Sequence, residues 1–109
     1  MAELDRERAA EAQIETRSDP AGVPIITVSG DLDISNAGAL EATVASVSAH
    51  RVGRLIFDLS GLRFMDSAGI AVLIDAAASV DAVEIRRPSP AIRRVLELTG
   101  LTGVLSIES

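Results

Sequence analysis

The chain has 109 residues, 48% of them hydrophobic, which is enough for a single domain with a real core. Its net charge of −6 excludes a broad cationic surface for nucleic acid. The absence of cysteine and lysine excludes disulfides, thiolate zinc sites, thiol catalysis and Schiff-base chemistry. The longest uncharged run, residues 20–30, is far shorter than the roughly 20 residues that span a bilayer, and the charged start is no signal peptide. We therefore expect a cytoplasmic protein without direct membrane insertion.

The N-terminal third predicts a flexible start followed by two paired strands. Residues 1–10 alternate charged residues with alanine, so we expect a flexible segment before a domain over residues 11–109. Apolar and polar side chains alternate over residues 11–17, which predicts a half-exposed strand. After a turn at 19–22, the β-branched run VPIITVSG at 23–30 predicts a second strand that pairs with the first.

The middle of the chain predicts a helix, a strand and a second helix. After an acidic corner at 30–33, Ser35 or Asn36 can cap a helix that runs to about residue 49. The apolar run at 54–60 predicts a strand covered on both faces, followed by a crossing of six or seven residues. The next helix should start at Ser67, and because it is apolar nearly all round we expect it to be largely buried.

The C-terminal part predicts a strand at 82–86, a third helix and a last strand at 104–108. Ser89 can cap the third helix, Pro90 fits its first position, and Gly100 is a preferred residue just past its end. The order β-β-α-β-α-β-α-β predicts an α/β single domain with a small mixed sheet packed with helices.

Ser67 stands where a helix begins, and free backbone N–H groups there favour an anion. On position alone, however, a purely structural N-cap is the favoured interpretation of Ser67. Asp31, Asp33, Asp58 and Asp66 could form an acidic phosphoacceptor or metal pocket, but the receiver type of pocket needs a lysine. Capping of strand ends is favoured for Asp31 and Asp33, and we expect Asp58 to bond backbone amides.

The stretch DLSGLRFMDSAGIAVL at 58–73 resembles the signature of STAS domains, above all of bacterial anti-sigma factor antagonists. In that family a strand ending in DLS is followed by MDSSG or MDSTG. VSGDLD at 28–33 resembles the family's second strand and corner, and PSPAIRRVLELTGL at 88–101 resembles its third helix and exit. The resemblance covers residues 11–107 in the family's order and implies the STAS fold.

The resemblance also implies a function, which is protein binding and not catalysis. Unphosphorylated members bind an anti-sigma factor of the histidine-kinase-like ATPase type and so release a sigma factor. Ser67 is then the implied phosphoacceptor: the anti-sigma factor phosphorylates it, which ends the complex, and a serine phosphatase reverses the change. No cofactor, metal or nucleic acid is implied. The implied partner surface around Ser67 comprises Asp31, Asp33, Met65, Asp66, Ala68 and Gly69.

Three points stay open. Ala68 stands where the family usually has serine or threonine, which favours an alternative: a non-phosphorylated STAS accessory subunit of a membrane transporter complex. A serine hydrolase would use Ser67 with His50, but MDSAG is not the GxSxG elbow and His50 has no known partner. For Gly69, close approach of a partner and packing within the chain are equally good explanations.

Overall fold

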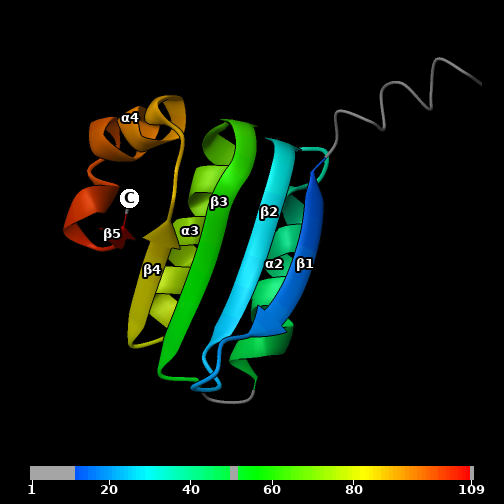
Figure 1. Cartoon of the computed structure of the whole chain (residues 1–109). Helices are drawn as coiled ribbons and strands as arrows, with labels where there is room; N and C mark the ends of the chain where they lie inside the picture. Colours follow the sequence, from blue (N-terminus) through cyan, green and yellow to red (C-terminus); the bar gives the residue numbers. More distant parts are fainter. Residues whose placement is uncertain (1–11, 50–51, 109) are drawn as a thin grey trace, which may run out of the picture.

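The computed structural model describes residues 12–49 and 52–108, so the segment predicted to be flexible and His50 lie outside the described residues. The described chain forms one sheet in the order β1-β2-β3-β4-β5 (Figure 1). β1 runs antiparallel to β2, and every other neighbouring pair is parallel, so the predicted mixed sheet is confirmed. The strands are β1 (Gln13–Ser18), β2 (Pro24–Leu32), β3 (Arg54–Met65), β4 (Ala82–Arg86) and β5 (Ser106–Glu108).

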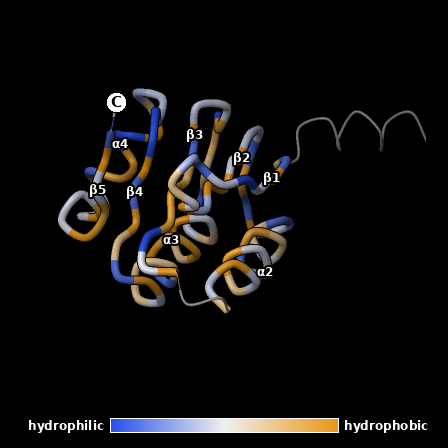
Figure 2. The backbone as a smooth tube through the Cα atoms, turned by 60° about the horizontal axis from the view of Figure 1, so that its bottom comes forward, coloured by the Kyte–Doolittle hydropathy of each residue, from blue (hydrophilic) through white to orange (hydrophobic). Residues whose placement is uncertain are grey.

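The helices connect the parallel strands in the predicted order. They are α2 (Ala37–Ser48), α3 (Ser67–Ser79) and α4 (Pro90–Leu98), followed by a short 3-10 helix η1 (Leu101–Gly103) that the sequence did not predict. Figure 2 shows α2 and α3 side by side against one face of the sheet. No described helix is long and apolar enough to cross a membrane.

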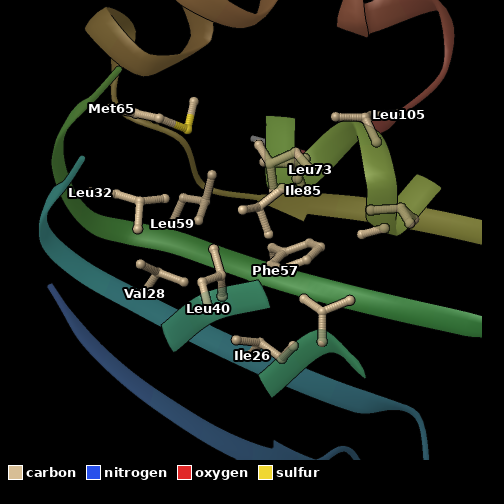
Figure 3. Close-up of a cluster of buried hydrophobic side chains, with 14 of the residues drawn as sticks. Ile26, Val28, Leu32, Leu40, Phe57, Leu59, Met65, Leu73, Ile85 and Leu105 are labelled. Atoms are coloured by element: carbon tan, nitrogen blue, oxygen red, sulfur yellow. The ribbon is translucent and has the colours of Figure 1, made fainter. Parts of the chain in front are cut away.

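The core lies between the sheet and these helices, and it is built from alternate residues of the central strands. Ile26, Phe57 and Ile85 are register partners on β2, β3 and β4, and all three are fully buried. Figure 3 shows them in one cluster with Leu40 of α2 and Leu73 of α3. Since successive side chains of a strand point to opposite faces, this register fixes which residues lie on the other face.

The other face of the sheet carries ion pairs, and no described helix lies across it (Figure 1). Glu84 on β4 accepts from Arg54 at 2.6 Å and from Arg86 at 2.7 Å. Ile25 and Ile56 are buried on this face, flanked by long charged side chains whose aliphatic stems can cover them. Residues 55–59 of the predicted apolar run are thus buried on both faces, but only one face is covered by helices.

Three predicted elements differ from the structure. β2 continues through the acidic corner to Leu32, and β3 continues to Met65, so the predicted crossing does not exist. The two strands resume their pairing after irregularities between Thr27 and Ser29 and between Gly30 and Asp31. The last strand is shorter than predicted, because a turn at Val104 and Leu105, which follows η1, occupies its first part.

The second helix is also less buried than predicted. Only one side of α3 packs on the sheet, so Ile74 on its other side is 47% exposed. By contrast, the capping predictions for α4 are confirmed: the Ser89 hydroxyl accepts from the Ile92 N–H at 3.2 Å, and Pro90 is the first helical residue. Gly100 follows the helix with φ of 77°, a conformation that favours glycine.

Candidate functional site

The carboxyl ends of the parallel strands β2 and β3 bring the acidic corner and the Ser67 motif together. Asp31 is the register partner of Phe64, and Leu32 is that of Met65. The chain then turns at Asp66 and enters α3, whose first residue, Ser67, is exposed. Two segments that are about thirty residues apart in sequence therefore form one surface at this edge of the sheet.

Asp66 is the N-cap of α3, which corrects the prediction that Ser67 caps the helix. The Asp66 Oδ1 atom accepts from the N–H of Ala68 at 2.9 Å and from that of Gly69 at 3.3 Å. Its other oxygen, Oδ2, accepts from the Ile34 N–H at 3.2 Å. The helix-start amides of Ala68 and Gly69 therefore already have an anionic acceptor, and the Ser67 hydroxyl makes no hydrogen bond within the described residues.

The two carboxylates of the corner are engaged in local structure. The Asp33 Oδ1 atom accepts from the N–H and the hydroxyl of Ser35, and the Asp33 N–H donates to the Asn36 Oδ1 at 2.9 Å. The Asn36 side chain also donates to the Asp31 carbonyl at 2.9 Å. The predicted structural role of Asp33 is thus confirmed. Asp31 instead forms an ion pair with Arg63 on β3, at 3.4 Å.

Asn36 is the N-cap of α2, as one of the two alternatives predicted, although its side chain bonds back to the corner rather than to the helix. Together these bonds brace the loop that carries Ile34. The backbone of the corner is therefore fixed by hydrogen bonds next to the start of α3, where Ser67 lies.

Met65 and Gly69, which the sequence interpretation placed on the partner surface, are buried. A Cβ added to Gly69 would lie 2.7 Å from the Met65 Cγ and 2.8 Å from the Leu32 Cδ2. Of the two explanations for Gly69, packing within the chain is the one that the structure supports. Ala68 is partly buried against the core. These residues shape the start of α3 from beneath rather than presenting side chains to a partner.

Two exposed apolar residues near the carboxyl ends of β2 and β3 were missed by the sequence analysis. Phe64 is 50% exposed at the end of β3, and Ile34 is 83% exposed on the corner tied to Asp66. The sequence did contain a signal for this exposure. Ile34 is the one large apolar residue in the polar stretch DISN, and Phe64 follows Arg63 at a predicted crossing. Exposed apolar side chains rimmed by carboxylates are typical of protein-binding surfaces.

Asp58 lies away from this surface and has a structural role. Its Oδ1 atom accepts from the Ser60 N–H at 3.0 Å, which confirms the predicted bond to a backbone amide, and Arg17 lies 3.7 Å from its Oδ2. Burial raises the pKa of Asp58, but the hydrogen bonds from Ser60 and the charges of Arg87 and Arg17 outweigh it and lower the pKa overall. Among the described residues, no group of three potential ligands could hold a metal ion.

Comparison of the chain with known proteins identifies related sequences. A family model described as "Mlab, STAS domain" matches residues 15–106. The anti-sigma F factor antagonist of Lysinibacillus sphaericus is 32% identical over 82 residues, which are 71% of this chain and 70% of the relative. The anti-sigma-F factor antagonist RsfB of Mycobacterium tuberculosis is 34% identical over 58 residues, which are 53% of this chain. That match spans 48% of RsfB, about half its length.

Solved structures confirm the predicted fold. An anti-sigma factor antagonist from Mycobacterium paratuberculosis superposes with a TM-score of 0.84 at 27% identity, covering 91% of this chain and 86% of that one. The unphosphorylated form of the anti-sigma factor antagonist SpoIIAA has a TM-score of 0.76 at 20% identity, covering 89% of both chains. The second likeness shows the fold alone.

Proposed function

This chain belongs to the STAS domain family, and we propose that it is an anti-sigma factor antagonist whose binding is switched off by phosphorylation of Ser67. The observation that carries the proposal is the division of roles at the start of α3. Asp66 caps the helix, while the neighbouring Ser67 hydroxyl is exposed and bonds to no described residue. A phosphate on Ser67 would therefore change the surface without removing a bond that holds the fold.

In the unphosphorylated state, the partner surface consists of exposed and half-buried groups at the ends of β2 and β3, next to the start of α3. Phe64 and Ile34 supply apolar area, and Asp31 and Asp33 supply the polar rim. Such a surface suits a protein partner, because apolar contacts at the centre exclude water and charged groups at the rim set orientation. Met65, Ala68 and Gly69 support this surface from beneath.

Phosphorylation would act on this surface by charge. A phosphoserine adds about −1.5 to −2 charges near neutral pH. Because Asp66 already accepts from the Ala68 and Gly69 N–H groups, the phosphate would stand beside a carboxylate instead of replacing water on free amides. Burying that charge against a partner costs free energy, so the complex is lost while the domain stays folded.

The relatives support the partner class. Both curated relatives are antagonists of an anti-sigma F factor, and SpoIIAA has also been solved in its phosphorylated form, with a TM-score of 0.70 to this chain. We therefore propose an anti-sigma factor of the histidine-kinase-like ATPase type as binding partner and kinase, and a serine phosphatase as the enzyme that restores binding. The protein itself acts by binding and not by catalysis.

The experiment combines intact-mass spectrometry with calorimetry. Each anti-sigma kinase of the same organism is incubated with the protein and ATP, and any phosphate is mapped to its residue. Ser67→Ala should bind one kinase tightly and take up no phosphate, whereas Ser67→Glu should bind much more weakly. Ser106→Ala, an exposed serine on β5, is the matched control and should behave like the wild type.

Equal binding by Ser67→Ala and Ser67→Glu would refute the switch. Tight binding without any phosphate transfer would leave an antagonist that is always active. Neither binding nor phosphate with any kinase would favour the alternative class, an accessory subunit of a membrane transporter complex, for which the replacement of the usual hydroxyl residue by Ala68 is the supporting observation.

A further inference from the structure

β1 is an edge strand whose outer side is open. It pairs with β2 on one side only, and no segment of the described chain pairs with its other side. An open strand edge carries unpaired N–H and C=O groups that can accept another strand. Most of β1 is also exposed, including Thr16 and Ser18, which lie on the helix side of the sheet.

A groove runs along this edge between β1 and α2. It consists of two adjoining hollows of about 440 and about 380 Å³, which share Thr16 of β1 and Ser46 and Val47 of α2. On the helix side its wall is made of small residues, Ala42, Thr43 and Ser46. In Figure 1, α2 runs behind β1 and β2, and the hollows lie where residues of α2 face those of β1.

The charge pattern of β1 is complementary to itself. Glu15 and Arg17 lie on the face of the sheet opposite α2, since Glu15 is in register with Thr27 and Arg17 with Ile25. If two β1 strands pair antiparallel about a two-fold axis, side chains stay on matching faces only when a residue pairs with its own copy. Centring on Thr16 places Glu15 opposite Arg17 of the second copy, and Arg17 opposite its Glu15.

Neighbouring registers lack this match. Centring the pair on Glu15 or on Arg17 places two like charges directly opposite each other, which is destabilising. Centring on Ile14 pairs Glu15 with Gln13, which offers no opposite charge, and it brings Arg17 opposite residue 11, which lies before β1 and outside the described residues. Among these registers, only the one centred on Thr16 forms two opposite-charge pairs between residues of β1 itself, and it also places Ile14 opposite Ser18 on the groove side.

We infer that two copies of this chain associate through β1, antiparallel and centred on Thr16, to form one continuous ten-stranded sheet. The second copy's β1 then lies along the outer edge, and its helix-side residues enter the groove beside α2. Ser67 follows β3 and lies on the other side of β2 from this edge, so it stays exposed in the dimer. The inference is therefore independent of the proposed switch.

Charge reversal tests the register by sedimentation velocity. The wild type should sediment as twice the monomer mass of 11.4 kDa at high concentration. Glu15→Arg and Arg17→Glu each replace both ion pairs by like-charged pairs and should weaken dimerisation roughly tenfold or more. A mixture of the two variants restores both ion pairs and should form the heterodimer. Asp81→Arg, a charge reversal near the start of β4, is the control and should leave the dimer intact.

A cysteine crosslink gives a second measurement that does not depend on charge. The natural chain has no cysteine, so Thr16→Cys introduces a unique thiol. Directly opposed residues of antiparallel strands have Cα atoms about 4.5 to 5.5 Å apart, within disulfide reach. Mild oxidation should convert Thr16→Cys to a covalent dimer, while Ser18→Cys, which faces Ile14, should crosslink far more slowly.

A wild type that sediments as a monomer up to millimolar concentration would overturn the inference, and would mean that the charges of β1 serve to keep the edge unpaired. A dimer that survives both charge reversals, or that crosslinks as well through Ser18→Cys as through Thr16→Cys, would overturn it too. Circular dichroism shows whether each variant is folded. Arg17→Glu also loses the ion pair between Arg17 and Asp58, so the Thr16→Cys crosslink, which keeps that pair, decides whether the dimer forms through β1.

Discussion

The Ile34 N–H donates a hydrogen bond of 3.2 Å to the Asp66 Oδ2, which ties the corner after β2 to the start of α3. The other oxygen of the same carboxylate accepts from the first-turn amides of α3. One side chain therefore positions both the exposed Ile34 and the helix that begins with Ser67. The surface and the hydroxyl beside it are held in a fixed relationship, so a change at Ser67 acts on a preformed site.

Removing this carboxylate should destabilise the domain. Asp66→Ala deletes the N-cap and the bond to Ile34, and should lower the free energy of unfolding by about 1 to 2 kcal/mol. Asp66→Asn keeps an acceptor oxygen and should cost less. Urea denaturation measures both variants, and an unchanged midpoint for Asp66→Ala would show that the cap contributes nothing.

Ser67→Ala should leave stability nearly unchanged, within about 0.5 kcal/mol, because the hydroxyl is exposed and does not cap the helix. The comparison is Ser89→Ala at the start of α4. There the serine is the N-cap and accepts from the Ile92 N–H, so its loss should cost about 1 kcal/mol. Thermal unfolding of the two variants tests the difference, and equal losses would contradict the assignment of the caps.

Gly69→Ala should destabilise the fold by about 1 to 3 kcal/mol, since the new methyl group would overlap Met65 and Leu32. Gly38→Ala is the matched control on α2, where nothing lies within 4 Å of the added Cβ. It should be neutral or stabilise by up to about 1 kcal/mol through helix propensity. Denaturant unfolding of both variants gives the comparison, and a stabilising Gly69→Ala would show that the site can relax.

Stability should fall in acid because of two buried carboxylates on the face without helices. Burial raises the pKa of Glu84, but the hydrogen bonds and charges of Arg54 and Arg86 outweigh it and lower the pKa below its ordinary value of 4.5. The pKa of Asp58 is also lowered from its ordinary value of 3.8. A pKa that is lower in the folded state means that the stabilisation is fully present above the unfolded value and is lost as the pH falls through the folded value.

The measurement is the free energy of unfolding from neutral pH down to pH about 3, a range that spans the ordinary carboxylate pKa values. Glu84→Gln should be less stable than the wild type at neutral pH and should lose less stability in acid. Glu108→Gln is the control, because that carboxylate is 61% exposed and pairs only loosely with Arg86 at 3.6 Å. Parallel pH profiles for wild type and Glu84→Gln would refute this origin of the acid sensitivity.

Phe64→Ala should weaken binding of the anti-sigma factor without unfolding the domain. Its ring is half exposed near the end of β3, and truncating an aromatic contact in an interface commonly costs more than about 1 kcal/mol, or roughly fivefold or more in Kd. Leu98→Ala on α4 removes a similarly exposed apolar side chain outside the surface and should bind like the wild type. Calorimetry measures both, and equal affinities would place the partner elsewhere.

Most of the secondary structure could be predicted because its signals are local. The alternation before the first turn, the β-branched run after it and the Ser89-Pro90 start of α4 all depend on neighbours within a few residues. The motif around Ser67 could be recognised for the same reason, because its residues are contiguous in the sequence. The boundaries that failed, at the ends of β2 and β3, depend on pairing between strands thirty residues apart.

The sequence by itself therefore determined the order of the elements, the family resemblance and the place of Ser67 at the start of a helix. Only the tertiary structure decided that Asp66 rather than Ser67 caps that helix, and that Phe64 and Ile34 lie exposed beside it while Met65 and Gly69 are buried. The physical reason is that local propensity sets where a helix starts. The packing of β2, β3 and α3 against one another determines which acceptor bonds the free amides of the first turn and which side chains reach solvent.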